Sequence, residues 1–468
     1  MIWKQKNRHK PSPILPRHPD LRSTENPLTV PANERFEDAP DGWPAWPPRI
    51  PELTHAISDS VARILQDGQW GTYPETTAKT LAEAARNQPG VHETGVHQQC
   101  TAKMMEAACE MVGTDRRGGT SNVAEATNAR RRARLCSSGT SAIELALRAL
   151  GVGSHKPSRQ ATDVILSAYD YPGNFRTIEL LGGRPVLCDT ESVSISRQSC
   201  SVTGVTPSLS SIESIQSPPG SVLLVSHLHG QLADSTALAN LCSDRDWMLI
   251  EDACQAFGAG TIETDAAGKD VFHPVGERAD WTTYSFGGSK PVTCGNGGAL
   301  VTQSEKRFHQ LRGIVDRPSD TFPMSPLQCA ALLPQLPLVS RWNAIRCENA
   351  LKLSQLDWES VGCMAIWDDN PAVIRAPYKF PVLARDAETR SRVLAAFKQI
   401  QLPCGEGFRS MHRTSDRRSS KPVPLDNAAI LSDRLLVVDH RALLADDVAD
   451  RVKACLRTIA GGSRIRSD

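Results

Sequence analysis

The fold is decided by residues 163–188, DVILSAYDYPGNFRTIELLGGRPVLC. Apolar runs at Asp163–Leu166 and Pro185–Cys188 predict two buried strands, and the stretch Asn174–Leu181 between them predicts a helix. Two strands that are joined by a helix normally lie parallel to each other in one sheet. This unit therefore predicts an α/β fold.

The same alternation extends to both sides of this unit. Strands are expected at Ala133–Cys136, Ser221–Ser226 and Trp247–Ile250, with helices at Ser141–Leu150 and Ala237–Leu241. Together they predict a large α/β domain that is built on a mostly parallel sheet. Ligands of such sheets bind beyond the carboxyl ends of the strands, so we expect the functional residues there.

The domain organisation follows from where this alternation begins and ends. Residues 1–45 are rich in Pro, Arg and Asn and predict a flexible N-terminal arm. Residues 46–330 are expected to form the large domain. Residues 331–468, where helices and strands also alternate, are expected to form a smaller C-terminal α+β domain. Three further stretches are expected to be insertions, near residues 76–96, 114–132 and 192–219.

The composition limits the kinds of partner. The 53 Lys and Arg residues against 52 Asp and Glu residues leave a net charge of +1, which gives no support for a nucleic-acid partner. No apolar run approaches the roughly 18 residues that a membrane helix needs, and the basic N-terminus lacks the apolar centre of a secretory signal. The 13 cysteines form no C-x-x-C pair, so we expect a cytoplasmic protein without disulfides or a metal site.

One lysine stands in an unusual setting, in residues 282–302, TTYSFGGSKPVTCGNGGALVT. Lys290 lies in a glycine-rich turn between two predicted apolar strands. A buried amine is more easily deprotonated, and a neutral amine can form a Schiff base with a carbonyl group. For a single lysine, the alternative of a side chain that reaches the surface beside the turn stays open.

A second motif, LIEDACQAFG at residues 249–258, ends a predicted strand with a carboxylate. Asp252 is placed to pair with the protonated ring nitrogen of pyridoxal phosphate (PLP), which enables that ring to accept electrons. Gln255, three residues later, is within reach of the phenolic oxygen of the same cofactor. Taken alone, Asp252 also fits the role of a helix N-cap.

Two further motifs complete a set of cofactor contacts. The turn SSGTS presents the backbone N–H groups of Gly139, Thr140 and Ser141 at the start of a helix, where a phosphate is stabilised. In SAYDYPGN, Tyr171 is a candidate for stacking on the cofactor ring. The alternative is that Tyr169 and Tyr171 both pack in the core.

Two groups of basic or histidine residues are less specific. His227 and His229 form an H-x-H pattern, but no third or fourth ligand is spaced nearby, so we expect a turn rather than a zinc site. Arg409, His412 and Arg413 are candidates for lining the substrate cleft.

In this order, the motifs resemble those of the DegT/StrS family of PLP-dependent sugar aminotransferases. The resemblance extends from about Trp70 to Gln335, and it implies the PLP-dependent transferase fold type I and a homodimer with sites near the subunit interface. The matching blocks are SSGTSAIELALRALGVG, DVILSAYDYPGNFRTIELLGGRPVLCD, VSHLHGQLAD, IEDACQAFGA, YSFGGSK and GNGGALVT.

The resemblance also implies a role for each candidate residue. Lys290 would bind PLP as a Schiff base, Asp252 would hold the pyridine nitrogen and Gln255 the phenolic oxygen. Tyr171 would stack on the ring. The phosphate would be held by Gly139, Thr140, Ser141 and Ser285.

The chain departs from the family pattern at two places. Gly287 and Gly288 stand where the family often has His-Pro, which predicts a roomier wall beside Lys290. Thr321-Phe-Pro-Met324 stands where the family often has a motif whose Asn reaches the neighbouring subunit's cofactor phosphate, so Thr321 would have to make that contact. Lys290 itself argues against the family branch that carries His at this position and acts as a sugar dehydratase.

These features predict an aminotransferase that moves an amino group from glutamate or glutamine to a keto-sugar, linked to a nucleotide, or to a keto-cyclitol. Two alternatives stay open. One is another PLP-dependent reaction on a sugar, such as dehydration. The other is a non-catalytic PLP-binding regulator, although the sequence contains no recognisable output module.

Overall fold

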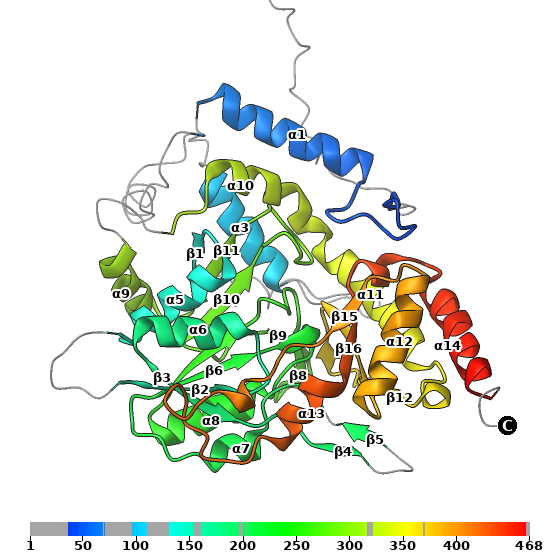
Figure 1. Cartoon of the computed structure of the whole chain (residues 1–468). Coiled ribbons are helices and arrows are strands. Elements are labelled where there is room, and N and C mark those ends of the chain that lie inside the picture. Colours follow the sequence, from blue (N-terminus) through cyan, green and yellow to red (C-terminus); the bar gives the residue numbers. More distant parts are fainter. Residues whose placement is uncertain are drawn as a thin grey trace, which may run out of the picture. The chain divides into compact units, whose positions relative to one another are not determined.

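The centre of the fold is a seven-stranded sheet with the strand order β1-β11-β10-β7-β6-β2-β3 (Figure 1). Strands β10, β7, β6, β2 and β3 pair in parallel, whereas β11 runs antiparallel to both of its neighbours, β1 and β10. The predicted, mostly parallel sheet is therefore confirmed. The strands are β1 Arg132–Cys136, β2 Asp163–Ser167, β3 Arg184–Cys188, β6 Val222–Ser226, β7 Met248–Asp252, β10 Trp281–Ser285 and β11 Gly298–Thr302.

This computed structural model describes most of the chain. The described residues are 36–68, 70, 96–109, 131–153, 161–195, 200–202, 204–315, 322–367 and 370–464.

Helices cover both faces of the large sheet (Figure 1). On β2, Val164 and Leu166 point to the core that contains Leu147 of α5, whereas Ile165 points to the core that contains Leu238 of α8. Because both faces are buried, these strands are continuously apolar, which is the pattern of a parallel sheet. The flanking helices are α5 Gly139–Ala149, α6 Pro172–Leu181, α7 Leu209–Glu213, α8 Ser235–Arg245 and α9 Glu305–Val315.

A smaller antiparallel sheet with the order β12-β14-β16-β15 follows in the C-terminal part of the chain. On β16, Leu436 and Val438 pack against helices α12 and α14, whereas Leu435 and Val437 point back to the core of the large sheet. The two sheets therefore share apolar contacts. The elements are β12 Cys363–Ala365, β14 Lys379–Ala384, α12 Ala387–Gln399, β15 Cys404–Glu406, α13 Asp426–Arg434, β16 Leu435–Asp439 and α14 Val448–Arg464.

The remaining elements connect or flank the two sheets. Strands β8, β9 and β13 form a third, three-stranded sheet, and β4 pairs with β5. The strands are β4 Val193–Ile195, β5 Cys200–Val202, β8 Gly260–Thr264, β9 Asp270–Pro274 and β13 Val373–Ile374. The helices are α1 Pro51–Gln66, α3 Val96–Cys109, η2 Leu228–Gly230, α10 Pro326–Leu332, η3 Leu333–Leu338, α11 Val339–Ser354, η4 Glu359–Val361, η5 Met411–Arg413 and η6 Ala442–Leu444.

The segment before α1 packs on the smaller sheet. Trp43 is fully buried in the core of that sheet, and Arg441 forms an ion pair with Asp41. The guanidinium group of Arg441 also donates to the Pro44 carbonyl oxygen over 3.3 Å. Residues 1–35 lie outside the described residues, and residues 35–468 form one compact unit. The predicted boundaries at residues 45 and 330 stay predictions.

The expected insertion near residues 192–219 is wrong for its second half. Val205, Ile212 and Ile215 are fully buried, and the latter two pack under β2 and β6. The Ser-rich composition conceals this apolar spacing, because serine caps and short turns alternate with the few core residues. Residues 76–95 and 114–130, in the other two expected insertions, lie outside the described residues.

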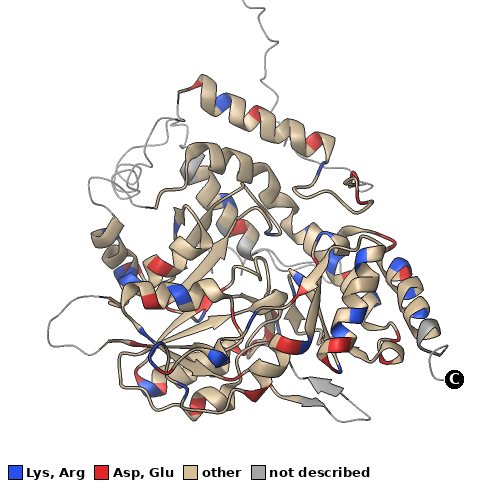
Figure 2. Ribbon diagram, viewed as in Figure 1, with Lys and Arg blue, Asp and Glu red and all other residues tan. Residues whose placement is uncertain are grey.

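Basic and acidic residues of the described part are mixed along its helices, and α14 carries both signs (Figure 2). Among the described helices, none is both long and apolar enough to cross a membrane.

Candidate active site

The turn that carries Lys290 connects β10 to β11 and is held by its own backbone. The N–H group of Phe286 donates to the carbonyl oxygen of Gly297 over 2.8 Å. The N–H group of Lys290 donates to the carbonyl oxygen of Gly287 over 2.9 Å. The Phe286 side chain is fully buried and meets Phe257 edge-to-face. The buried ring and the backbone bonds fix where the turn leaves the sheet.

The Lys290 side chain is half-buried and contacts an aromatic ring. Its Nζ atom lies 4.7 Å from the centroid of the Tyr378 ring, and the Tyr378 hydroxyl is 3.2 Å from Ser289 Oγ. No carboxylate of the described residues forms an ion pair with Lys290. The amine is therefore not committed to a charged partner.

Asp252 ends β7 and is surrounded by donors from neighbouring elements. Its Oδ2 accepts hydrogen bonds from Asn174 Nδ2 (2.9 Å) and Ser226 Oγ (3.4 Å), and its Oδ1 accepts from Thr283 Oγ1 (3.2 Å) and the Cys254 N–H (3.0 Å). These bonds fix the orientation of the carboxylate at the carboxyl end of the sheet, where a ligand is expected.

A second buried carboxyl group lies beside Asp252. The Asn174 amide that donates to Asp252 also reaches Asp170 Oδ1 over 3.4 Å, and the Tyr171 N–H donates to the same oxygen. Among the described residues, Asp170 Oδ2 is buried without a hydrogen-bond partner. Burial, together with the charge of Asp252, raises the pKa of Asp170 to about 8. Asp170 is therefore mostly protonated at neutral pH.

Gln255 is oriented by the backbone of η2. Its Oε1 accepts from the N–H group of His229 over 2.9 Å, which leaves its Nε2 without a hydrogen-bond partner among the described residues. The His229 ring contacts the Tyr169 hydroxyl (3.3 Å), which in turn accepts from the Phe408 N–H (3.1 Å). Burial lowers the pKa of His229 to about 3, so this ring is neutral.

The predicted phosphate turn opens α5 directly against β10. Ser138 caps the helix by accepting from the Ser141 N–H over 3.0 Å. A Cβ atom on Gly139 would lie 2.7 Å from Ser285 Cβ and 2.8 Å from Cys254 Sγ, so only glycine allows this approach. The structure thus brings Gly139, Ser141 and Ser285 together, and Thr140 is exposed at the same helix end.

The two tyrosines after β2 differ in burial. Tyr169 is fully buried, whereas Tyr171 is 42% exposed and meets Phe408 edge-to-face with ring centroids 6.0 Å apart. The core-packing alternative therefore applies to Tyr169 and not to Tyr171.

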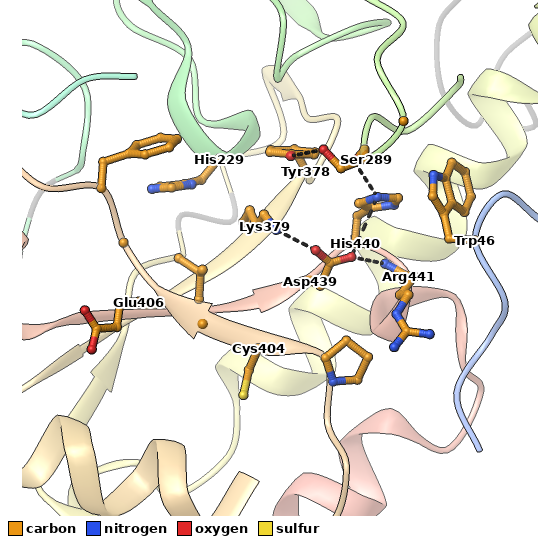
Figure 3. Close-up of a pocket in the computed structure, with 16 residues that line it drawn as sticks. Trp46, His229, Ser289, Tyr378, Lys379, Cys404, Glu406, Asp439, His440 and Arg441 are labelled. Carbon is orange, nitrogen blue, oxygen red and sulfur yellow. Dashed lines mark hydrogen bonds and ion pairs between the residues drawn. The ribbon is translucent and has the colours of Figure 1, made fainter. Parts of the chain in front are cut away.

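A pocket of about 570 Å³ adjoins the Lys290 turn (Figure 3). Gly288 and Ser289 of the turn form part of its wall, and Lys379 and Asp439, which form an ion pair, line it from the smaller sheet. A Cβ atom on Gly288 would meet its nearest neighbour at 3.6 Å, so packing alone does not require glycine there. The lining residues are Trp46, His229, Gly288, Ser289, Tyr378, Lys379, Pro403, Cys404, Gly405, Glu406, Gly407, Phe408, Val437, Asp439, His440 and Arg441.

Of the less specific candidates, His229 lines this pocket and the others lie elsewhere. His227 Nε2 is 2.8 Å from Glu251 Oε2, and its Nδ1 accepts from the Ala233 N–H over 3.2 Å, so His227 is a buried structural residue. None of Arg409, His412 and Arg413 lines the pocket, whose wall ends at Phe408 in that part of the chain.

Sequence patterns did not single out several of these neighbours. Ser226 and Thr283 stand at the ends of strands next to β7, and that position is a usable signal for them. Tyr378, Lys379 and His440 come from the smaller sheet, which no local motif connects to Lys290. Thr321 lies outside the described residues.

Known proteins share this fold. The chain superposes on the aminotransferase from Psychrobacter cryohalolentis with a TM-score of 0.67 at 18% identity, over 92% of this chain and 99% of that one. This agrees with the predicted PLP-dependent transferase fold type I. At this identity the likeness shows the fold alone.

Two curated relatives are similar in sequence. The provisionally named L-glutamine:3-amino-2,3-dideoxy-scyllo-inosose aminotransferase of Micromonospora echinospora is 28% identical over 60% of this chain and 66% of that protein. The UDP-2-acetamido-2-deoxy-3-oxo-D-glucuronate aminotransferase of Pseudomonas aeruginosa is 28% identical over 64% of this chain and 74% of that protein. The chain thus spans slightly less than two thirds of the first relative.

The family assignment is established by a match to most of the chain. The sequence profile of the DegT/DnrJ/EryC1/StrS aminotransferase family matches residues 121–457. Aminotransferases of this family use pyridoxal phosphate, which is the cofactor that the motifs predict. The resemblance found in the sequence is confirmed, and the chain belongs to the DegT/DnrJ/EryC1/StrS aminotransferase family.

Proposed function

We propose that this protein is a PLP-dependent aminotransferase. It would move an amino group from glutamate or glutamine to the carbonyl group of a keto-sugar, linked to a nucleotide, or of a keto-cyclitol. The observation that carries this proposal is the Lys290 amine, which contacts the Tyr378 ring and has no carboxylate partner among the residues that the structure describes. The names of the two relatives support the substrate class, because one is a scyllo-inosose aminotransferase and the other is a UDP-sugar aminotransferase.

Unused polar groups support the fit of the cofactor. Gln255 Nε2 is a donor that lacks an acceptor among the described residues and would meet a phenolic oxygen. The N-terminus of α5 offers the backbone N–H groups of Gly139 and Thr140 to a phosphate, whereas the Ser141 N–H already donates to Ser138. Besides Gly139, we assign the phosphate to Thr140, Ser141 and Ser285. The exposed ring of Tyr171 would stack on the cofactor.

When bound, PLP supplies an electron sink for the carbanion at the substrate Cα atom. Asp252 would hold the proton at the ring nitrogen, because its carboxylate is fixed by four donors. The Lys290 amine would act as general base and carry the proton from the donor's Cα atom. The mostly protonated Asp170 adds little negative charge beside Asp252.

The pocket beside Lys290 would receive the ketone. Its wall combines the Tyr378 and Trp46 rings with the paired Lys379 and Asp439, a mixture of apolar and hydrogen-bonding groups that suits a hydroxylated ring. The missing side chain at Gly288 widens it.

We also propose that the protein acts in the cytoplasm as a homodimer, without a nucleic-acid or membrane partner. Thr321 would then be the residue to examine for a contact with the neighbouring subunit's cofactor phosphate. Size-exclusion chromatography with light scattering measures the oligomeric state, and a monomer would contradict the dimer.

A spectroscopic experiment tests the main proposal. The purified protein with added PLP is expected to show a visible absorbance band that borohydride abolishes, and the Lys290→Ala variant is expected to lack it. Adding glutamate or glutamine should convert the cofactor to its amine form, and keto-cyclitols and nucleotide-linked keto-sugars should then be compared for reversing this change. A parent protein without the band would refute the proposal.

The same assay separates the alternatives. Transfer of a labelled amino group from the donor to a ketone identifies a transaminase. Loss of water from a sugar without such transfer would indicate a dehydratase, and binding of PLP without any turnover would indicate a regulator.

A further inference from the structure

Two buried side chains contact backbone carbonyl groups of the residues that precede and follow Lys290. His440 Nε2 lies 2.9 Å from the carbonyl oxygen of Ser289, and Arg346 Nη2 lies 3.5 Å from that of Pro291. Neither residue belongs to the large sheet, since His440 follows β16 and Arg346 lies in α11. The turn that carries the reactive amine is therefore held from outside as well as by its own backbone.

The protonation of His440 follows from its partners. Arg346 Nη2 lies 3.4 Å from His440 Nδ1, and a guanidinium group can only donate. Nδ1 is therefore the acceptor, and Nε2 carries the hydrogen that is donated to Ser289. Burial lowers the pKa of His440 to about 3, which keeps this ring neutral. The charged groups near it are Asp439, Arg346 and Lys379.

Arg346 is fully buried and lacks the partner that such a cation usually has. It donates to Asn343 Oδ1 over 3.3 Å, and no carboxylate of the described residues is hydrogen-bonded to it. Its Nε atom is buried without an acceptor. Burial lowers the pKa of Arg346 to about 9. A buried cation without a paired anion is costly, so its retention calls for a function of its own.

Trp46 covers this pair from the N-terminal segment. Its ring meets that of His440 edge-on at a centroid distance of 4.5 Å and 89°, and the Arg346 guanidinium lies 5.4 Å from its centroid. His440 lies between Ser289 and Trp46 (Figure 3). Arg441, the next residue after His440, holds the same segment through Asp41.

We propose that His440 and Arg346 are positioning residues for Lys290, and that Trp46 shields their contacts from water. The Ser289–Lys290 peptide group is held at both ends, by Gly287 and by His440, and Arg346 holds the next carbonyl but one, that of Pro291. These contacts limit how far the backbone of the turn can redirect the lysine side chain. A preoriented amine meets a bound aldehyde more often in a productive geometry. The inference rests on the proposed role of Lys290 as the residue that binds PLP covalently.

The test separates covalent capture from cofactor binding. The neutral Lys290 amine adds to the PLP aldehyde and one water leaves, and borohydride then delivers hydride to the new carbon–nitrogen double bond and fixes a secondary amine. Pyridoxamine 5'-phosphate has no aldehyde, so its affinity reports the pocket without Lys290. Both Kd values are measured for the parent and for His440→Leu, His440→Gln, Trp46→Ala and Trp46→Phe.

Replacing the N–H donor of His440 with an apolar side chain is expected to weaken the binding of PLP but not that of pyridoxamine 5'-phosphate. His440→Leu should raise the Kd for PLP at least about tenfold and slow borohydride fixation, because the Ser289 carbonyl loses the donor that orients the turn. The Kd for pyridoxamine 5'-phosphate should change less than about threefold. His440→Gln, whose amide can donate to the same carbonyl, should restore PLP binding.

The Trp46 variants leave both positioning side chains in place, so they test the covering ring even if His440→Leu does not fold. Trp46→Ala is expected to weaken the binding of PLP and to leave the binding of pyridoxamine 5'-phosphate unchanged. Trp46→Phe is expected to change neither Kd. If His440→Leu loses affinity for both ligands equally, or if none of the four variants changes PLP capture, the inference is overturned. Either result leaves the proposed function standing. A parent that never captures PLP would overturn the proposed function as well.

Discussion

Replacing Asp170 with Asn tests the buried carboxyl pair beneath the proposed cofactor site. Asp170 shares the Asn174 amide with Asp252, and its Oδ2 has no partner. Asn has nearly the same shape but cannot ionise, so Asp170→Asn removes one titration and little volume. The other titratable groups that face Asp170 are Tyr169 and Cys188, and burial raises the pKa of both, so they stay protonated.

The magnitude follows from the two protonation states of Asp170. Its pKa is 3.8 in the unfolded chain and about 8 in the folded protein, because of burial and the charge of Asp252. Between these values the folded state keeps a proton that the unfolded chain has released, so stability falls as the pH rises from about 4 to about 8. At about 1.4 kcal/mol per pH unit, the full effect approaches about 6 kcal/mol, of which about 4 kcal/mol lies between pH 5 and pH 8.

The assay is urea unfolding of the cofactor-free parent and of Asp170→Asn at several pH values from 5 to 9. All other titrating groups are common to both proteins, so the difference in unfolding free energy reports the titration of Asp170 and its coupling to Asp252. The Asn variant should gain stability relative to the parent as the pH rises, and the gain should level off above about pH 8. A difference that does not depend on pH would refute this account of the pair.

Three further substitutions probe other parts of the structure. Gly139→Ala places a Cβ 2.7 Å from Ser285 Cβ, and it should raise the Kd for pyridoxamine 5'-phosphate at least about tenfold in a binding titration, because the helix end must retreat. Gly230→Ala combines φ of +85° with a Cβ 2.2 Å from the Ala376 carbonyl oxygen, so calorimetry should show a loss of at least about 2 kcal/mol. Phe397→Ala empties a fully buried site of the smaller sheet and should lower the urea-derived stability by about 3–5 kcal/mol.

The fold was largely predictable because its signals are local. The strand expected at Asp163–Leu166 occurs at Asp163–Ser167, and the helix expected at Asn174–Leu181 occurs at Pro172–Leu181. One end of each element differs from the expected end by one or two residues. The ends of elements are set by capping and local hydrogen bonds, which apolar periodicity does not report. The segment around Ile212 was misjudged for the opposite reason, because its few core residues are diluted by serine.

The candidate site was predictable only where its residues follow strands. Asp252 and Ser285 each end a strand of the large sheet, so the topology of a parallel sheet gathers them at one edge. Asp170 gives no such signal, because an acid after a strand is usually solvated, and only the structure shows that it is buried against Asp252. A buried pair arises from two strands that are not adjacent in sequence, and no periodicity reports it.

Control of the reactive amine depends on contacts that are remote in sequence. Ser289 and Pro291 are held by residues from α11 and from the end of β16, which are separated from Lys290 by 55 and 150 positions or so along the chain. The local turn is enough to place Lys290 at the edge of the sheet. Fixing the direction of its amine also needs contacts from elements that are remote in sequence. Helix α11 and the end of β16 supply these groups, and the smaller sheet also forms one wall of the pocket. Changes in the smaller sheet should therefore alter substrate choice and amine geometry together, whereas a swap of pocket residues other than Trp46, Tyr378 and His440 should alter substrate choice alone.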